Sequence, residues 1–576
     1  MAKLKNFFSN LFKYENQEPY TFSLSEKTDE NDLNEKTNNS SSTSTSDTLK
    51  NKEPKKVFSN LDVNLEHIKV KYNLMINSDI NIREFTLTAR GKQYNAFILY
   101  IDGLTDTKTI NDFVLEPLML KNTANSFDGD QDRVIREAVT NNITVRKVKK
   151  FDLTDYIYSN LIPQNSVNKV TEFDDIVKSV NMGNCILFVD TIDTAFDIDA
   201  KGFEKRSIST PQNEVVIRGS QEGFTEALRT NTSILRRLVN NENLIIENIS
   251  VGEISKTVCS VCYMKNIVND DLVSEVKYRL NNLNIDFLLS SGQLEQLIED
   301  NGKYSLPQMI ASERPDKAAN YLLEGRVVII VNGSPYCLIV PGLFFDFIAS
   351  PEDINLKYQF ANLIKIVRIF ALVIAILLPG LYIATTNFHQ ELIPTELLFA
   401  IISSRESVPF PIIFEILIME ISFELIREAG LRVPNPIGPT IGIIGALIIG
   451  QAAVDASIVG PILIIVVAIT GISSFAIPDF SFSFHFRVMR FIYLLLGFFL
   501  GFVGISIGIF IYLTILFSMS SFGVPYLSPF IPITKINNKG FLLSPSWKRE
   551  TRSDFLNTKR LKKQKHISMA WKHQRK

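Results

Sequence analysis

Residues 366–533 are dominated by Ile, Leu, Phe, Val and Gly, and this apolar region constrains the fold of the 576-residue chain more than any other feature. Its first stretch, Ile366–Thr385, carries a single charge, Arg368. At about 1.5 Å of rise per residue, twenty helical residues cover roughly 30 Å, the thickness of a hydrocarbon core. The chain is therefore predicted to be a multidomain membrane protein whose all-α polytopic domain spans about residues 351–535.

The apolar region divides into about four expected crossings, near 366–385, 408–427, 441–470 and 488–518. The third is too long for one simple span, and Gln451, Asp455, Gly460 and Pro461 interrupt it, so we expect it to be broken or partly re-entrant. Residues 548–576 carry eleven Lys and Arg against two acidic residues. The positive-inside bias then places this basic tail, residues 536–576, in the cytoplasm. Lys357 and Lys365 place the start of the first span on the same side, which leaves both termini cytoplasmic and requires an even number of crossings.

The first 350 residues resemble soluble protein. Residues 1–56 include a polar, repetitive stretch that cannot bury enough apolar surface to fold, so a disordered leader is expected. Strand and helix patterns alternate from there on, and Asn332–Gly333 marks a hairpin turn. We predict an N-terminal mixed α/β cytoplasmic region of two subdomains, residues 57–205 and 206–350.

The sequence lacks the common catalytic and metal-binding motifs. The pair Cys259 and Cys262 lies in a segment that alternates like a strand, where residues three apart point to opposite faces. A second cysteine pair that could complete a zinc site is missing, as are the phosphate-binding loop and the nucleophile elbow. We expect no enzyme activity, no cofactor, no metal and no nucleic-acid partner.

Charges accumulate in the segment 403–434 although it is otherwise apolar. Glu420, Glu424, Arg427 and Glu428 fall within roughly a 100° arc of one helix, and Glu415 lies away from it. Lipid does not tolerate such a stripe, because an ionised side chain in hydrocarbon costs at least ~2.5 kcal/mol. Two interpretations remain open. The stripe forms ion pairs such as Glu424 with Arg427 near the membrane interface, or it lines an ion path. The ion-path candidates are Glu415, Glu420, Glu424, Gln451 and Asp455.

Two further residue sets are candidates for contacts. Glycines spaced four, three and four apart favour a close helix-packing seam, either within one subunit or between subunits. This seam comprises Gly497, Gly501, Gly504 and Gly508. The basic residues of a soluble motif are Arg218, Arg229, Arg236 and Arg237. A glycine-rich loop before a helix can bind anions, but a subdomain or subunit contact is the favoured interpretation.

Several long motifs resemble the A subunits of GerA-type spore germinant receptors. They include "REFTLTARGKQYNAFILYIDGLTDTKTINDFVLEPLM", "EVVIRGSQEGFTEALRTNTSILRRLV", "ERPDKAANYLLEGRVVIIVNGSPYCLIVP" and "SRESVPFPIIFEILIMEISFELIREAGLRVPNPIGPTIGIIGALIIGQAAVDASIVGP". The match covers about residues 57–532 in order.

The resemblance implies a multi-pass protein of the spore inner membrane that senses nutrient germinants. It also implies a transporter-like B subunit and a lipoprotein C subunit as partners, and a homo-oligomer around a membrane pore. Our primary hypothesis is a germinant-receptor A subunit that forms a nutrient-gated cation channel. The alternatives are a solute transporter and a membrane scaffold for the nutrient-binding subunit.

Overall fold

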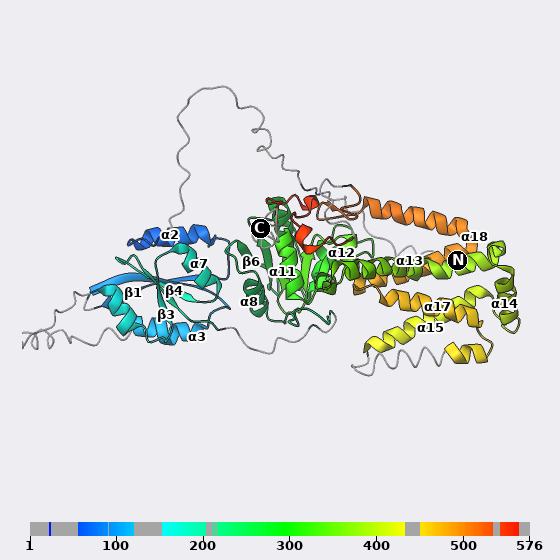
Figure 1. The fold of residues 1–576 in the computed structure, drawn as a ribbon, viewed down its shortest axis with the longest axis horizontal. Coiled ribbons are helices and arrows are strands. Elements are labelled where there is room, and N and C mark those ends of the chain that lie inside the picture. The colour runs from blue at the N-terminus through cyan, green and yellow to red at the C-terminus, as the bar shows by residue number, and fades with distance from the viewer. Residues whose placement is uncertain are drawn as a thin grey trace, which may run out of the picture.

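The structure is a computed structural model that describes residues 22, 24, 56–89, 92–119, 152–202, 211, 214, 216–432, 450–533 and 542–563, without the side chains of 431 and 432. The expected disordered leader therefore lies outside the described residues except at 22, 24 and 56. Three parts follow one another along the long axis of the molecule (Figure 1): two α/β units, each built on its own sheet, and a helical part.

The first unit is a five-stranded antiparallel sheet with the order β1-β2-β4-β5-β3. Helices α2 and α7 cover one face, and α3, α4 and α6 with the intervening π-helical turns cover the other. The elements are α2 (Leu61–Lys71), β1 (Ile80–Ala89), β2 (Lys92–Ile101), α3 (Thr107–Ile110), η1 (Asn111–Leu115), α4 (Glu116–Met119), α6 (Leu153–Tyr156), η2 (Ile157–Leu161), β3 (Val167–Val170), α7 (Phe173–Asn181), β4 (Cys185–Val189) and β5 (Ala195–Ile198).

The second unit repeats this arrangement. Its five strands are also antiparallel throughout, in the order β6-β7-β9-β10-β8, so both sheets place their strands in the relative order first, second, fourth, fifth, third. The elements are α8 (Leu228–Leu238), β6 (Leu244–Val251), β7 (Thr257–Met264), α9 (Asp270–Asn281), α10 (Ser291–Ile298), β8 (Ile310–Ser312), α11 (Pro315–Glu324), β9 (Val327–Val331) and β10 (Cys337–Val340). The repetition was not evident from the sequence.

The burial of β9 agrees with its central position in the second sheet. All five of its residues, Val327–Val331, are buried, as expected for a strand with both faces covered. The β9–β10 hairpin turns where the sequence predicted, and Gly333 there has φ +84°, a left-handed conformation that favours glycine. Cys259 and Cys262 of β7 lie in the cores on opposite faces of the sheet, also as predicted. Burial raises the pKa of the Cys259 thiol to about 12.

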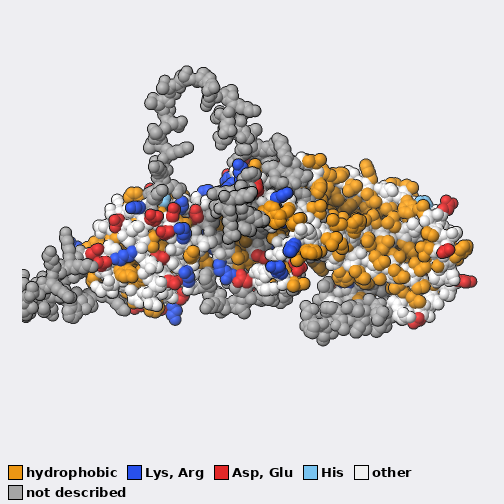
Figure 2. All heavy atoms as spheres, viewed as in Figure 1, with side chains coloured by type: hydrophobic (Ala, Val, Ile, Leu, Met, Phe, Trp, Pro, Cys, Tyr) orange, Lys and Arg blue, Asp and Glu red, His pale blue; other side chains and the backbone are white. Residues whose placement is uncertain are grey.

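The helical part begins where α12 leads out of the second unit. Its elements are α12 (Phe344–Ile348), η3 (Pro351–Ile354), α13 (Tyr358–Phe388), η4 (Gln390–Leu392), α14 (Thr395–Arg405), α15 (Ile412–Arg432), α17 (Pro461–Phe475), α18 (Phe480–Ser518), β11 (Ser520–Ser521) and β12 (Val524–Pro525). Within the described residues, α13 and α18 are long and apolar enough to cross a membrane, and α17 is a shorter apolar helix. Figure 2 shows that apolar side chains are spread over the surface of the helical part, whereas charged side chains are scattered over the two α/β units.

Helix α18 is a hairpin rather than the single span expected for 488–518. Gly501 breaks it with φ +61° and ψ −142°. The two arms pack against each other, because His485 stacks on Tyr512 at a centroid distance of 5.8 Å and a Cβ at Gly504 would lie 2.4 Å from the Leu496 carbonyl oxygen. At about 1.5 Å per residue each arm covers roughly 25–30 Å. Both ends of α18 therefore lie on the side of the soluble units, and Gly501 lies at the far end.

The core of the second unit continues into the helical part. One hydrophobic cluster joins Ile330 of β9 and Leu322 of α11 to Leu372 of α13 and to Phe482 and Ile505 of α18. A polar contact fixes α13 to the segment that leads out of the second unit: Arg368 of α13 donates to Asp353 Oδ2 of η3 at 2.7 Å. The second unit and the helices α13 and α18 thus form one packed body.

The described part of the C-terminal tail is docked on this body. It contains η6 (Ser546–Lys548) and η7 (Asp554–Leu556). Leu543 exchanges two hydrogen bonds of 2.6 and 3.1 Å with Asn362 of α13, and Arg552 donates to the Leu323 carbonyl of α11 at 2.7 Å. The described tail therefore contacts both α13 and the second unit.

Candidate functional site

The charged face of α15 meets arginines from the same chain. Glu420 and Glu424 approach Arg490 Nη2 of α18 at 3.0 and 2.8 Å, and Glu424 also accepts from Arg487 Nη1 at 3.1 Å. The Glu420 and Arg490 side chains are 0% and 1% exposed. An ion pair so completely removed from water persists only because each charge has its partner beside it.

Arg427 completes this cluster from the next turn of α15. It lies 3.7 Å from Glu424, hydrogen-bonds the Ser474 hydroxyl of α17, and stacks over the Phe475 ring at 4.3 Å. Glu420, Glu424 and Arg427 share one helix face, as the predicted arc requires. We call Glu420, Glu424, Arg427, Arg487 and Arg490 the ion-pair cluster; with three arginines and two glutamates, it has a formal charge of +1.

Glu415 lies apart from the ion-pair cluster, as its angular position predicted. Its fully buried carboxylate accepts from Arg405 Nη2 of α14 at 3.0 Å and from the backbone N–H of Gly460 at 3.1 Å. The residue therefore ties the end of α14, the first turn of α15 and the start of α17 together.

Gln451 and Asp455 are exposed and pair with each other, with Gln451 Nε2 donating to Asp455 Oδ1 at 3.1 Å. Within the described ranges no hydrogen bond or ion pair joins them to the ion-pair cluster. The structure thus places the five ion-path candidates in three groups: Glu420 with Glu424, Glu415 alone, and Gln451 with Asp455.

The four glycines serve tight contacts within the chain. A Cβ at Gly497 would lie 2.5 Å from the carbonyl oxygen of Gly380 in α13, so the two helix backbones meet there. Gly501 forms the turn of α18, and Gly504 and Gly508 face the other arm of the same hairpin. Because the turn redirects the chain, the seam does not form one continuous face.

Arg236 joins the two soluble units. The guanidinium is 1% exposed and donates to both carboxylate oxygens of Asp79 at 2.8 Å, to Asn77 Oδ1 at 3.2 Å and to the Leu244 carbonyl at 2.8 Å. The backbone N–H of Ser78 also donates to the Ile246 carbonyl of β6 at 2.9 Å. The segment that precedes β1 therefore covers the outer edge of the second sheet.

The other three arginines of the motif have different environments. Arg229 forms an ion pair with Asp102 of the first unit, Arg237 pairs with Glu222, and Arg218 is exposed. Arg229 and Arg237 also line a cavity of about 220 Å³ between the units, together with Gly103, Thr105, Asp106, Thr107, Gly202, Thr230, Ser233 and Ile234.

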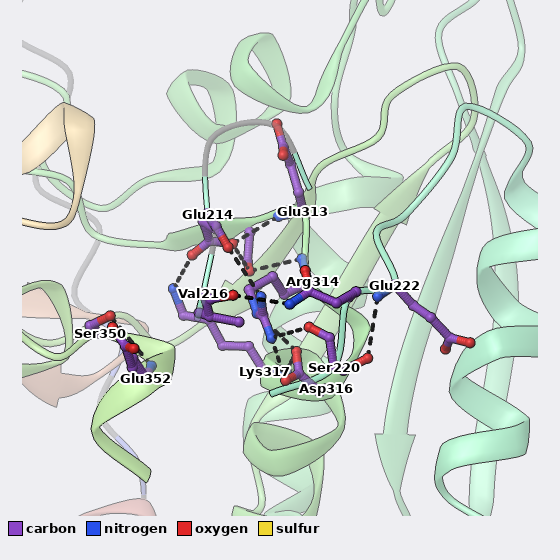
Figure 3. A network of polar contacts seen from close by, with 12 residues as sticks. Glu214, Val216, Ser220, Glu222, Glu313, Arg314, Asp316, Lys317, Ser350 and Glu352 are labelled. Atoms are coloured by element: carbon purple, nitrogen blue, oxygen red, sulfur yellow. Dashed lines mark hydrogen bonds and ion pairs between the residues drawn. The ribbon is translucent and has the colours of Figure 1, made fainter. Parts of the chain in front are cut away.

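Sequence reasoning missed the residue that fixes the glycine-rich loop before α8. Arg314, at the N-terminus of α11, is fully buried and donates to the carbonyls of Glu214 and Ser220 at 3.1 and 2.9 Å and to Asp316 (Figure 3). Lys317 pairs with the Glu214 carboxylate at 2.8 Å. The guanidinium of Arg314 thus binds two backbone carbonyls of this loop, those of Glu214 and Ser220.

Sequence reasoning also missed Arg487 and Arg490. Two arginines three residues apart inside the apolar stretch "FSFSFHFRVMRF" are the signal that points to them, since buried cations require partners. Among the described residues, no group of three or more His, Cys, Asp or Glu side chains could hold a metal ion.

Comparison with known proteins identifies the family. Residues 66–555 match the family described as Bacillus/Clostridium GerA spore germination protein. The chain belongs to this family. It is 39% identical over 471 residues to spore germination protein KA of Bacillus subtilis (strain 168), covering 82% of each chain. It is 40% identical over 353 residues to spore germination protein A1 of the same organism, covering 61% of this chain and 73% of that one.

A third relative from that organism, the uncharacterized membrane protein YfkQ, is 36% identical over 504 residues, covering 88% of this GerA-family chain and 92% of the relative. Among solved structures, the N-terminal domain of the A subunit of the Bacillus megaterium spore germinant receptor GerK3 is 30% identical, with a TM-score of 0.35. The match covers 50% of this chain and 97% of that domain. Membership of the GerA family supports a role in spore germination and an association with the membrane.

Proposed function

We propose that the chain is the A subunit of a nutrient germinant receptor in the spore inner membrane, where several copies surround a nutrient-gated cation path. A transporter-like B subunit that binds the nutrient and a lipoprotein C subunit would complete the receptor. The relatives named as spore germination proteins support the role in germination. Both termini of the proposed multi-pass chain would lie in the cytoplasm.

The observation that carries the conduction proposal is the ion-pair cluster itself. Five charged side chains lie between apolar helices, where ionisable residues are costly and usually functional. A purely structural helix bundle could use apolar side chains of similar volume at no loss of stability.

Asp455 is the candidate best placed to meet a hydrated cation. Its carboxylate is exposed, and its described hydrogen bond comes from the neutral Gln451 amide rather than from a cation. Rings of carboxylates in an oligomer attract cations and repel anions. We therefore propose that Asp455 contributes to the entrance of the path, and that Glu420 and Glu424 lie further along it.

The signal from the nutrient would enter the helices through the second unit. Its sheet shares one core with α13 and α18, so a displacement of that sheet must repack those helices. The continuous core therefore favours mechanical coupling between the soluble region and the proposed path.

Current recordings of the purified three-subunit receptor in a planar bilayer test this function. Nutrient-dependent, stepwise cation currents support the channel. Saturable nutrient uptake without such steps would instead support a transporter, and neither activity would support a scaffold. Asp455→Asn should lower cation over anion permeability several-fold, whereas Glu391→Gln, which removes another exposed carboxylate beyond the end of α13, should not.

A further inference from the structure

The ion-pair cluster joins one helix that carries the carboxylates to another that carries most of the arginines. Glu420 and Glu424 project from α15, and Arg487 and Arg490 project from the first arm of α18. Arg490 Nη2 reaches both carboxylates, at 3.0 and 2.8 Å. A separation of α15 from α18 would therefore expose two carboxylates at once.

The pairing is incomplete at the level of hydrogen bonds. Both oxygens of Glu420, and Nε and Nη1 of Arg490, are buried without a hydrogen-bond partner. The Nε atoms of Arg427 and Arg487 are likewise buried without a hydrogen-bond partner. Buried polar groups are usually satisfied, and a half-satisfied network is easier to rearrange than a complete one, because alternative pairings regain hydrogen bonds.

The arginine-bearing arm is attached directly to the soluble region. His485, two residues before Arg487, hydrogen-bonds Ser305 of the second unit at 2.6 Å. Phe482 packs on Phe344 and Phe347 of α12, with centroid distances of 5.2 and 5.4 Å. A movement of the second unit is thus transmitted to the turn of α18 that holds Arg487.

We propose that Arg487 and Arg490 are positioning residues that hold Glu420 and Glu424 in a closed pairing, and that nutrient gating separates them so that the carboxylates line the cation path. This inference rests on the proposed function. In the closed pairing the formal charge of +1 repels cations. Once Arg487 and Arg490 withdraw with α18, Glu420, Glu424 and Arg427 remain on α15, and their formal charge is −1. The regulated event is therefore a change of electrostatic sign along the path.

The test records the reconstituted receptor with and without nutrient. Arg490→Gln removes the shared cation, so we expect nutrient-independent cation conductance at least tenfold above that of the unchanged receptor. Arg490→Lys keeps the charge but replaces the planar guanidinium with a single, differently placed nitrogen, and should give an intermediate value. Arg405→Gln is the matched control, because it removes the partner of another buried carboxylate, Glu415, without touching α18.

A charge exchange separates gating from misfolding. Arg490→Glu combined with Glu420→Arg restores one pair of opposite charges and should return the resting conductance toward that of the unchanged receptor, whereas Arg490→Glu alone should leave it raised. The positioning role is overturned if Arg490→Gln is inserted normally, responds to nutrient and stays silent without it. If the unchanged receptor passes no current with nutrient and Arg490→Gln passes none either, the conduction proposal falls together with this role. Equal leakage from Arg405→Gln would also overturn it, because the effect would then follow any lost buried pair.

Discussion

Arg236 provides the sharpest test of how the soluble region is held together. Changing it to Met keeps the length and apolar stem of the side chain but removes the guanidinium. Asp79, which is 11% exposed, then loses both of its 2.8 Å bonds, and the Leu244 carbonyl and the Asn77 amide oxygen lose one each. All of these acceptors belong to the contact between the two α/β units.

The expected cost follows from this loss. Removing one partner of a buried, hydrogen-bonded ion pair costs about 3–5 kcal/mol, because the remaining charge stays buried without compensation. Asp79 retains some access to water, which places the expectation near the lower limit, about 3 kcal/mol. At about 1.4 kcal/mol for each factor of ten, the contact would open on the order of 100-fold more often.

Hydrogen exchange measured by mass spectrometry on the full chain reads this opening segment by segment. In Arg236→Met, the amides of residues 77–79 and β6 should exchange on the order of 100-fold faster, while those of β9 should change little. Arg237→Met removes a half-exposed ion pair with Glu222 and should alter exchange by less than about fivefold, as expected for a pair worth up to ~1 kcal/mol. If Arg236→Met and Arg237→Met give the same small change, the arginine does not hold the two units together.

Three further outcomes are expected. Gly497→Leu should disrupt the contact between α13 and α18 and lower the yield of folded protein, because its Cβ would already lie 2.5 Å from the Gly380 carbonyl; a thermal-stability assay in detergent measures this. Cys259 and Cys262 should resist alkylation by maleimide until the protein is denatured, since burial keeps their thiols protonated. Burial raises the pKa of Glu299 from an ordinary 4.5 to about 7, so its contribution to stability should fall as pH rises from about 4.5 to 7, and Glu299→Gln should flatten that slope in denaturant titrations at several pH values.

Local features of the fold were predictable because their causes are local. Two-residue periodicity placed Cys259 and Cys262 on opposite faces, and Asn332–Gly333 marked the β9–β10 turn. The angular spacing of charges on α15 likewise separated Glu415 from Glu420 and Glu424. Each inference needed only the geometry of one helix or strand.

Features that depend on contacts between distant segments were not predictable in this way. Arg490 lies some 70 residues from Glu420, and nothing in either segment specifies that they meet. Gly501 resembled the other glycines of the seam, yet only it adopts the left-handed conformation that reverses α18. The repeated strand order was hidden as well, because two sheets with different side chains can share a topology without sharing a pattern.

The contacts between the two α/β units and the helices determine how a signal would travel. Both α/β units have the same strand order, yet only the second shares a hydrophobic core with α13 and α18 in the described part of the chain. Within the described residues, a change in the first unit therefore reaches the helices by way of the second, and the contact made by Arg236 and residues 77–79 lies on that route. In the proposed receptor, weakening this contact should reduce the nutrient response while leaving the resting conductance low, since the ion-pair cluster is untouched. Loss of Arg490 should do the reverse, so the two variants together separate transmission of the signal from closure of the path.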